Sequence, residues 1–483
     1  MRTRHGGLIG IIALTGAMIG ASTGASVLAA PPMAGLSEGV ETDPARLAEL
    51  PHTGLATFGC VINEPEVQTG PRGVIPADVI TMIDNGDPAN RVDLVFVGDG
   101  YQAGQLATYA IHCQNGLNDL LAITPFSNYQ NFFNAHRVEV ISTDSGVDHD
   151  PTQGILRNTA IGMGFWCQGI ERLLCVNTFL ASQYADNAPD VDQIFAVANS
   201  TKYGGAGYPS VDLGTYAGGN GLAPDIAIHE LGHALGNLAD EYTYGGPVTW
   251  TGGEPGTANS SIFGSSQMST MQTKWWDWLG SADEGGVCGT FVGCNYSELG
   301  IYRPSNNSMM RALGRPFNNV SIEALVIEIY KQVNPIDSAT PPGSYNNGDT
   351  ISIQTVDPVG HNLTIQWYSD GQPVAGANGK SFYPYTLPLG AGTHAISVTV
   401  IDNTTMVRDE AARAAHMSEA RGGWTVFALP GDINGDCVVN TADLGGLISV
   451  FDRPGPYADL NGDGVVDTAD LGQLISNFGQ SCP

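Results

Sequence analysis

The order of apolar and polar residues predicts alternating strands and helices in the part of the chain before residue 333. Residues 91–97 form a short apolar run typical of a buried strand, and residues 137–142 and 193–198 repeat it. Residues 103–121 instead carry apolar side chains at helical spacing along one face. Two more helices are expected, at 225–235 and 321–333. Alternating strands and helices favour an α/β domain built around a central sheet.

The pattern changes after residue 345. Residues 350–353, 363–367 and 395–400 alternate apolar and polar side chains, the period of strands with one buried face. Asp370-Gly371 is typical of a hairpin turn. Trp367 lies in a middle strand, which predicts an all-β, immunoglobulin-like sandwich over residues 346–428. Residues 334–345 contain three prolines and are interpreted as a linker.

The end of the chain carries an internal repeat. The segment from Asp432 to Asp443 returns as Asp459 to Asp470, and a short predicted helix follows each copy. Oxygen-bearing residues stand at loop positions 1, 3, 5, 9 and 12, and position 7 offers its backbone carbonyl, as in calcium-binding loops. An acidic surface alone would not repeat this spacing. The predicted calcium ligands are Asp432, Asn434, Asp436, Val438, Asn440 and Asp443 in loop one, and Asp459, Asn461, Asp463, Val465, Asp467 and Asp470 in loop two.

Length and charge narrow the classes of partner. The chain has 483 residues, enough for several domains, and its 48 acidic and 19 basic side chains give a formal net charge of −29. Such a surface repels nucleic acid and anionic membranes, so we expect neither as a partner. It suits solubility and calcium binding.

The N-terminus predicts export. In residues 1–30, Arg2 and Arg4 precede a short apolar stretch, and small residues follow it, as in a secretory signal peptide. No later stretch is apolar enough to span a bilayer. Residues 31–64 lack periodicity and are interpreted as a lead segment or a propeptide.

The eight cysteines agree with an oxidising compartment. Sequence alone cannot prove how cysteines pair. Their positions suggest the disulfides Cys167–Cys175, Cys288–Cys294, Cys437–Cys482 and, from the remaining two, Cys60–Cys113.

The strongest chemical signal lies in the helix predicted at 225–235. His229 and His233 stand four residues apart with Glu230 directly after the first. Positions i and i+4 share one face of a helix, so both imidazoles can bind one zinc ion beside a carboxylate that accepts a proton from metal-bound water. Gly236 is expected to end the helix in a left-handed conformation.

Zinc needs a third protein ligand and an open position. Metzincin-like sites often place that ligand ten residues after the first histidine, but Ala239 stands there and has no ligand atom. Asp240 is the nearest oxygen ligand, and Glu241 is the alternative.

Residues about 65–333 resemble the IgA-peptidase family of secreted zinc metallopeptidases. The resemblance rests on residues 229–242 and on the segments 97–101, 145–149, 203–207 and 303–310. It implies a metzincin-like zincin fold, His229, His233 and Asp240 as zinc ligands, and Glu230 as the general base. It also implies a methionine turn, with Met309 and Met310 as the floor of the site. Immunoglobulin A need not be the substrate.

Residues 431–483 resemble a dockerin, the small α-helical calcium module that attaches secreted enzymes to a cohesin-bearing partner. Cys437 occupies position 6 of loop one, where glycine and a positive φ are usual. A Cys437–Cys482 disulfide would hold that turn.

Together these features predict a multidomain zinc endopeptidase with one catalytic zinc and two calcium ions in its tail. We expect it to be secreted, or bound to a cell surface through the tail, and to act on a protein or peptide. The alternative is a catalytically weak zincin that serves as a binding module. Residues 244–307 form a long glycine-rich segment with an aromatic cluster around Trp275, which would serve either as a wall of the substrate cleft or as a core patch.

Overall fold

The computed structural model describes residues 62, 73–387, 389–454 and 458–483. The predicted signal peptide and the lead segment, apart from Ile62, therefore lie outside the described residues. Within the described part of the chain, no helix is both long enough and apolar enough to cross a membrane.

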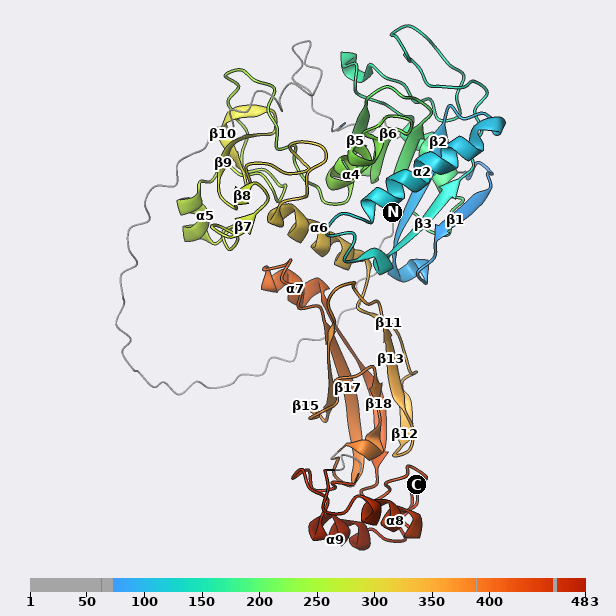
Figure 1. Cartoon of the computed structure of the whole chain (residues 1–483), viewed down its shortest axis with the longest axis vertical. Coiled ribbons are helices and arrows are strands. Elements are labelled where there is room, and N and C mark those ends of the chain that lie inside the picture. The colour runs from blue at the N-terminus through green and yellow to red at the C-terminus, as the bar shows by residue number, and fades with distance from the viewer. Residues whose placement is uncertain (1–61, 63–72, 388, 455–457) are drawn as a thin grey trace. The chain divides into compact units, whose positions relative to one another are not determined.

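The first domain is built around a six-stranded mixed sheet with the order β1-β3-β2-β4-β6-β5 (Figure 1). Strands β2, β3, β4 and β6 run parallel, while β1 and β5 are antiparallel edge strands. The bounds are β1 Val79–Ile83, β2 Val92–Asp99, β3 Phe133–Val138, β4 Gln193–Ala198, β5 Gly205–Tyr208 and β6 Leu213–Ala217.

Helices complete the α/β arrangement. Helices α2 (Leu106–Leu120), α4 (Ala223–Ala234) and α6 (Asn319–Gln332) share one apolar core with the sheet, and α3 (Thr178–Ala185) contributes to a second core. The strand predicted at 137–142 was misplaced, because β3 ends at Val138. Beyond it, Ser142 donates a hydrogen bond to the buried Asp99 instead of joining the sheet.

The long segment after residue 244 contains regular structure: α5 (Ser265–Met271), β7 (Ala282–Asp283), β8 (Gly286–Val287), β9 (Phe291–Cys294) and β10 (Ser297–Arg303). Trp275 and Trp278 are buried in a small core with Met268 and Cys288. These two members of the aromatic cluster are therefore core residues, whereas Trp276 between them is exposed.

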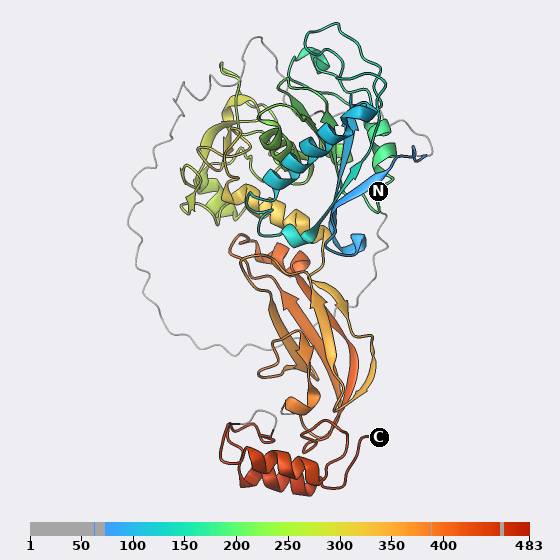
Figure 2. The same cartoon turned by 45° about the vertical axis from the view of Figure 1, so that its right-hand side comes forward.

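Residues 336–428 form two sheets (Figure 2). The sheets share a core around Trp367. One sheet contains β11 (Ile336–Ala339), β13 (Ile351–Thr355) and β16 (Ser381–Phe382). The other contains β12 (Gly343–Asn346), β18 (Ser418–Ala428), β17 (Gly392–Ile401), β14 (Thr364–Ser369) and β15 (Gln372–Pro373), and α7 (Glu410–His416) lies between β17 and β18 in sequence. The linker predicted at 334–345 is thus wrong in part, because two strands begin within it. Pro341 and Pro342 lie between those strands, where no ladder hydrogen bond is lost.

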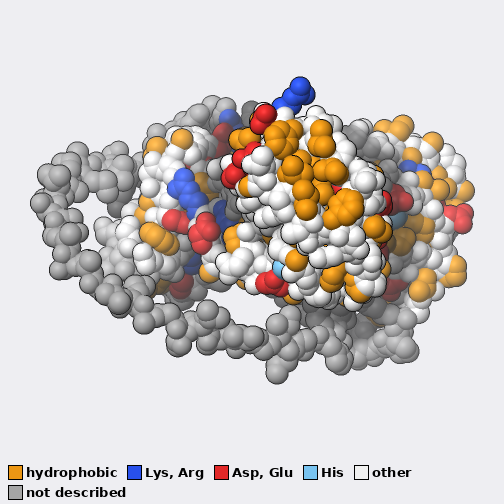
Figure 3. Space-filling view, turned by 90° about the horizontal axis from the view of Figure 1, so that it is seen from below, with side chains coloured by type: hydrophobic (Ala, Val, Ile, Leu, Met, Phe, Trp, Pro, Cys, Tyr) orange, Lys and Arg blue, Asp and Glu red, His pale blue; other side chains and the backbone are white. Residues whose placement is uncertain are grey.

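The tail contains two short helices, α8 (Thr441–Ser449) and α9 (Thr468–Ser476). Val439, Leu447, Val466 and Leu474 form its core. Ile448 and Ile475, which occupy equivalent positions in the two repeats, are exposed. Figure 3 shows the molecule from below the view of Figure 1, with hydrophobic side chains grouped on that face.

Two of the suggested disulfides are present, Cys167–Cys175 and Cys437–Cys482. Cys113, Cys288 and Cys294 are buried free thiols, so the suggested pair Cys288–Cys294 is wrong. Cys60, the suggested partner of Cys113, lies outside the described residues. Cys113 lies within the apolar core of α2, and Cys288 and Cys294 belong to different core clusters.

Candidate metal centre

Helix α4 carries the two histidines and the glutamate on a buried face. Pro224 stands in its first turn, where its missing N–H costs nothing, and Asp225 complements the positive end of the helix dipole. His229, Glu230 and His233 are all buried, the last completely.

The expected role of Gly236 is wrong. The residue with a left-handed conformation is Asn237, with φ of 46°, and Leu238 N then donates to Gly232 O at 3.0 Å. Gly236 is needed for space instead, since a Cβ there would stand 2.9 Å from both Gly232 O and Leu325 Cδ2. The turn directs the chain back so that Asp240 faces the helix.

Three ligand atoms converge at this point. Nε2 of His229 and Nε2 of His233 are 3.2 Å apart, and Asp240 Oδ1 lies 3.1 Å from the first and 3.3 Å from the second. Ligands about 2.0–2.1 Å from a tetrahedral zinc ion stand roughly 3.3 Å from each other. The triangle therefore has the size that zinc requires, and Glu241 is not part of it.

The atoms of these three side chains that point away from the triangle also form hydrogen bonds. His229 Nδ1 lies 3.0 Å from Met309 O, and His233 Nδ1 lies 2.7 Å from Leu238 O. When each carbonyl accepts a proton from Nδ1, the Nε2 lone pair is left for a metal ion, as in metal-binding histidines. The Tyr296 hydroxyl donates to Asp240 Oδ2. Burial raises the pKa of Asp240, but the two histidines outweigh it and hold this pKa well below its ordinary value.

Glu230 lies between the helix and the edge of the sheet. A Cβ on Gly207 would stand 3.0 Å from Glu230 Oε2, and a Cβ on Gly205 would stand 3.4 Å from Oε1. A Cβ on Gly214 would stand 3.1 Å from Glu230 Cβ. Bare backbone on β5 and β6 therefore makes the space that the carboxylate occupies beside the ligand triangle.

The methionine segment lies beneath the helix. Met309 contacts His229 through its carbonyl oxygen, and a Cβ on Gly232 would stand 2.6 Å from Met310 Sδ. Glu241, which follows Asp240 in the chain, forms two hydrogen bonds to the methionine segment. Its N–H donates to Met310 O, and its carboxylate accepts from Ser308 Oγ at 2.7 Å. Asn259 and Asn318 also donate to that carboxylate. Burial raises the pKa of Glu241 against these hydrogen bonds.

The tail presents two similar loops. In loop one, Asp432, Asp436 and Asp443 offer oxygens that all lie within 4.8 Å of one another. Asp443 Oδ1 accepts from Ile433 N, and Asp470 Oδ1 accepts equivalently from Leu460 N in loop two. The three carboxylates of loop one therefore stand at a spacing that one calcium ion can bridge.

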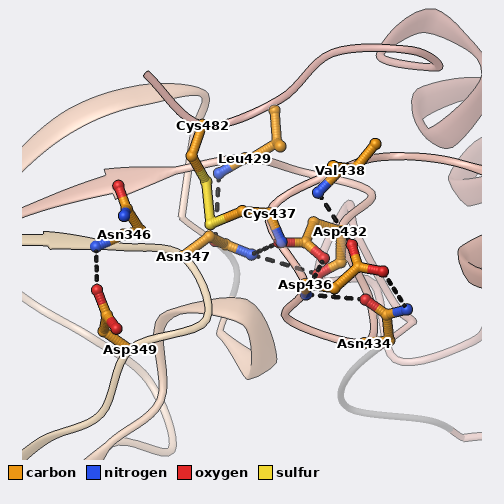
Figure 4. Close-up of a disulfide and its surroundings, with 10 residues drawn as sticks. All are labelled: Asn346, Asn347, Asp349, Leu429, Asp432, Asn434, Asp436, Cys437, Val438 and Cys482. Atoms are coloured by element: carbon orange, nitrogen blue, oxygen red, sulfur yellow. Dashed lines mark hydrogen bonds between the residues drawn. A yellow bond between two sulfur atoms is a disulfide. The ribbon is translucent and has the colours of Figure 1, made fainter.

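The surroundings of loop one are drawn in Figure 4. Cys437, bonded to Cys482, has φ of 67°, so it adopts the left-handed conformation usual for glycine at this position. Asp432 also accepts a hydrogen bond of 3.1 Å from Asn347 Nδ2, outside the tail repeat.

Comparison with known proteins confirms both resemblances seen in the sequence. Residues 80–285 match the model of the family described as IgA Peptidase M64, which is a peptidase family. Residues 430–479 match the model of the dockerin type I domain. The chain is therefore a multidomain protein that carries a peptidase-family region and a C-terminal dockerin domain.

No curated protein matches the chain. A solved structure titled "Type II cohesin-dockerin domain from Bacteroides cellolosolvens" shows 43% identity, covering 11% of this chain and 88% of that chain, with a TM-score of 0.11.

Sequence reasoning missed two features of the site. Tyr296 lies far along the chain from the motif, and no ligand spacing pointed to it. The glycines of β5 entered only as part of the segment 203–207. Because side chains alternate between the two faces of a strand, Gly205 and Gly207 leave one face of β5 without side chains.

Proposed function

We propose that the first domain is a zinc endopeptidase. The observation that carries this proposal is the ligand triangle of His229, His233 and Asp240, whose sides of 3.1–3.3 Å suit a tetrahedral zinc ion. The match to a peptidase family supports peptide bonds as the target.

Each residue of the site has a distinct role in this proposal. The two imidazoles and the Asp240 carboxylate hold the metal, which supplies Lewis acidity when bound. Glu230 accepts the proton of the attacking water and delivers it to the leaving amine. The carbonyls of Met309 and Leu238 keep both histidines in the tautomer that binds metal.

We further propose that the segment around Ile62 is part of a propeptide. Ile62 N donates to Gly207 O at 2.8 Å, on the side of edge strand β5 that does not face β6. An extended peptide substrate adds to such an edge through the same backbone groups. Ile62 therefore occupies an acceptor next to Glu230 that a substrate would use.

The tail is proposed to bind two calcium ions and to dock onto a cohesin-like partner. The dockerin match and the two repeated loops support this role. With the predicted signal peptide, docking would place the enzyme outside the cell, either free or on a surface. The immunoglobulin-like sandwich is proposed as the module between them.

A peptide-library digest, with and without a zinc chelator, tests the enzymatic proposal. We expect internal cleavage that the chelator abolishes and that added zinc restores. Zinc binding without any cleavage would favour the alternative, a catalytically weak zincin that serves as a binding module.

A further inference from the structure

Tyr296 stands in a turn whose backbone does not favour tyrosine. Strands β9 and β10 pair Cys294 with Ser297, so Asn295 and Tyr296 form a two-residue hairpin turn. Their φ angles are 47° and 62°. This is the turn in which both central residues have positive φ, and asparagine followed by glycine is its preferred sequence. Asparagine is present, but a bulky side chain replaces the glycine.

The turn packs directly on the loop that carries the third predicted zinc ligand. Asn295 N donates to Asp240 O at 2.9 Å, and Tyr296 N donates to Tyr242 O at 3.1 Å. The Tyr296 ring stacks on Tyr244, with centroids 5.3 Å apart and planes at 11°. These contacts leave the ring little freedom and aim its hydroxyl at Asp240.

The hydroxyl engages the carboxylate oxygen that does not face the histidines. Asp240 Oδ1 is directed at both imidazoles, while Oδ2 accepts the hydrogen bond from Tyr296. Together with the contacts of Oδ1, this bond fixes the rotation of the carboxylate about its Cβ–Cγ bond. A residue in a disfavoured conformation at a functional site, with its polar group on a ligand, indicates a functional reason for the strain.

We propose that Tyr296 is a positioning residue that orients Asp240 for zinc. The proposal rests on the zinc site proposed above and assigns a residue to it outside the motif. Groups that hold a metal ligand in this way typically change metal affinity by about 10- to 100-fold when they are removed. Glycine at this position would relieve the turn and lose the hydrogen bond, so stability and metal affinity should change in opposite directions.

The experiment compares Tyr296→Phe, Tyr296→Gly and Tyr244→Phe in the full chain. Tyr244→Phe is the matched control, because it removes a hydroxyl from the other ring of the stacked pair, one that accepts a hydrogen bond from Arg172. Zinc affinity is measured by competition with a chromogenic chelator, and the melting temperature of the metal-free protein is measured in parallel.

We expect Tyr296→Phe and Tyr296→Gly to bind zinc about 10- to 100-fold more weakly, and Tyr244→Phe to bind it as the wild type does. Metal-free Tyr296→Gly should melt at or above the wild-type temperature. Wild-type zinc affinity in Tyr296→Phe would overturn the inference, as would equal weakening in Tyr244→Phe. Zinc binding by the wild type without peptide cleavage would reject the proposed enzyme but leave this result interpretable.

Discussion

His229 Nδ1 lies 3.0 Å from the backbone carbonyl of Met309, 80 residues further along the chain. The floor of the site thus meets the predicted zinc ligand through backbone, while the Met310 sulfur packs beneath Gly232. Met309 therefore contacts the site through its backbone and Met310 through its side chain.

Gly232→Ala should destabilise the fold. Its Cβ would stand 2.6 Å from Met310 Sδ and 3.3 Å from Phe317 Cε1, so the floor must shift. Overpacking of this kind costs about 1–3 kcal/mol, which calorimetry would detect as a lower melting temperature. Gly104→Ala is the control, because nothing lies within 4 Å of a Cβ there. Equal melting temperatures for both variants would contradict the packing argument.

Glu230→Gln should retain zinc and lose most peptidase activity. The amide cannot accept the water proton, and a general base typically contributes on the order of a hundredfold or more to the rate. Metal analysis and kcat/KM on a peptide substrate would be measured on the same preparation. Turnover at the wild-type rate in zinc-replete buffer would exclude this role for Glu230.

Asp240→Ala and Glu241→Ala should separate metal binding from stability. The first variant removes a ligand atom and should lose zinc on dialysis. The second should hold more zinc but melt at a lower temperature, because three buried donors, from Asn259, Ser308 and Asn318, lose their acceptor. If Glu241→Ala loses more zinc than Asp240→Ala, the ligand assignment must move to Glu241.

Ile62→Pro should raise the activity of the full chain if Ile62 occupies a position on β5 that a substrate needs. Proline has no N–H, so the hydrogen bond to Gly207 O is lost and that acceptor is opened to a substrate. Val74→Pro is a control at an exposed position in the same part of the chain. Identical kcat/KM values for the wild type and Ile62→Pro would argue against a propeptide at this edge.

Calcium binding should order the tail. The carboxylates of each loop repel one another until an ion neutralises them, so binding is coupled to folding. Titration of the chelated full chain should reveal two sites, and Asp463→Ala should remove one. Asp452→Asn, a tail residue outside both loops, should keep two. Failure of the wild type to retain calcium would reject the ion assignment.

The motif helix, the strands at β2 and β4 and the position of Asp240 could be predicted because local spacing encodes them. The contact between Tyr296 and Asp240 could not, because it depends on a hairpin folding back across 56 residues. The two prolines near residue 341 suggested a linker, yet they stand between strands, where their missing N–H groups do no harm. Local rules work where neighbours along the chain decide the structure, and fail where distant segments meet.

Because Gly205 and Gly207 leave one face of β5 without side chains, the metal-binding motif does not by itself define the surroundings of Glu230 in a related sequence. With alanine at Gly207, a methyl group would press on Glu230 Oε2 at 3.0 Å, although every residue of the motif would remain intact. A substitution at Gly207 would therefore crowd the carboxylate proposed as the general base without changing any residue of the motif. Gly205 and Gly207 should therefore be compared together with His229, Glu230 and His233 when related sequences are tested for the proposed activity.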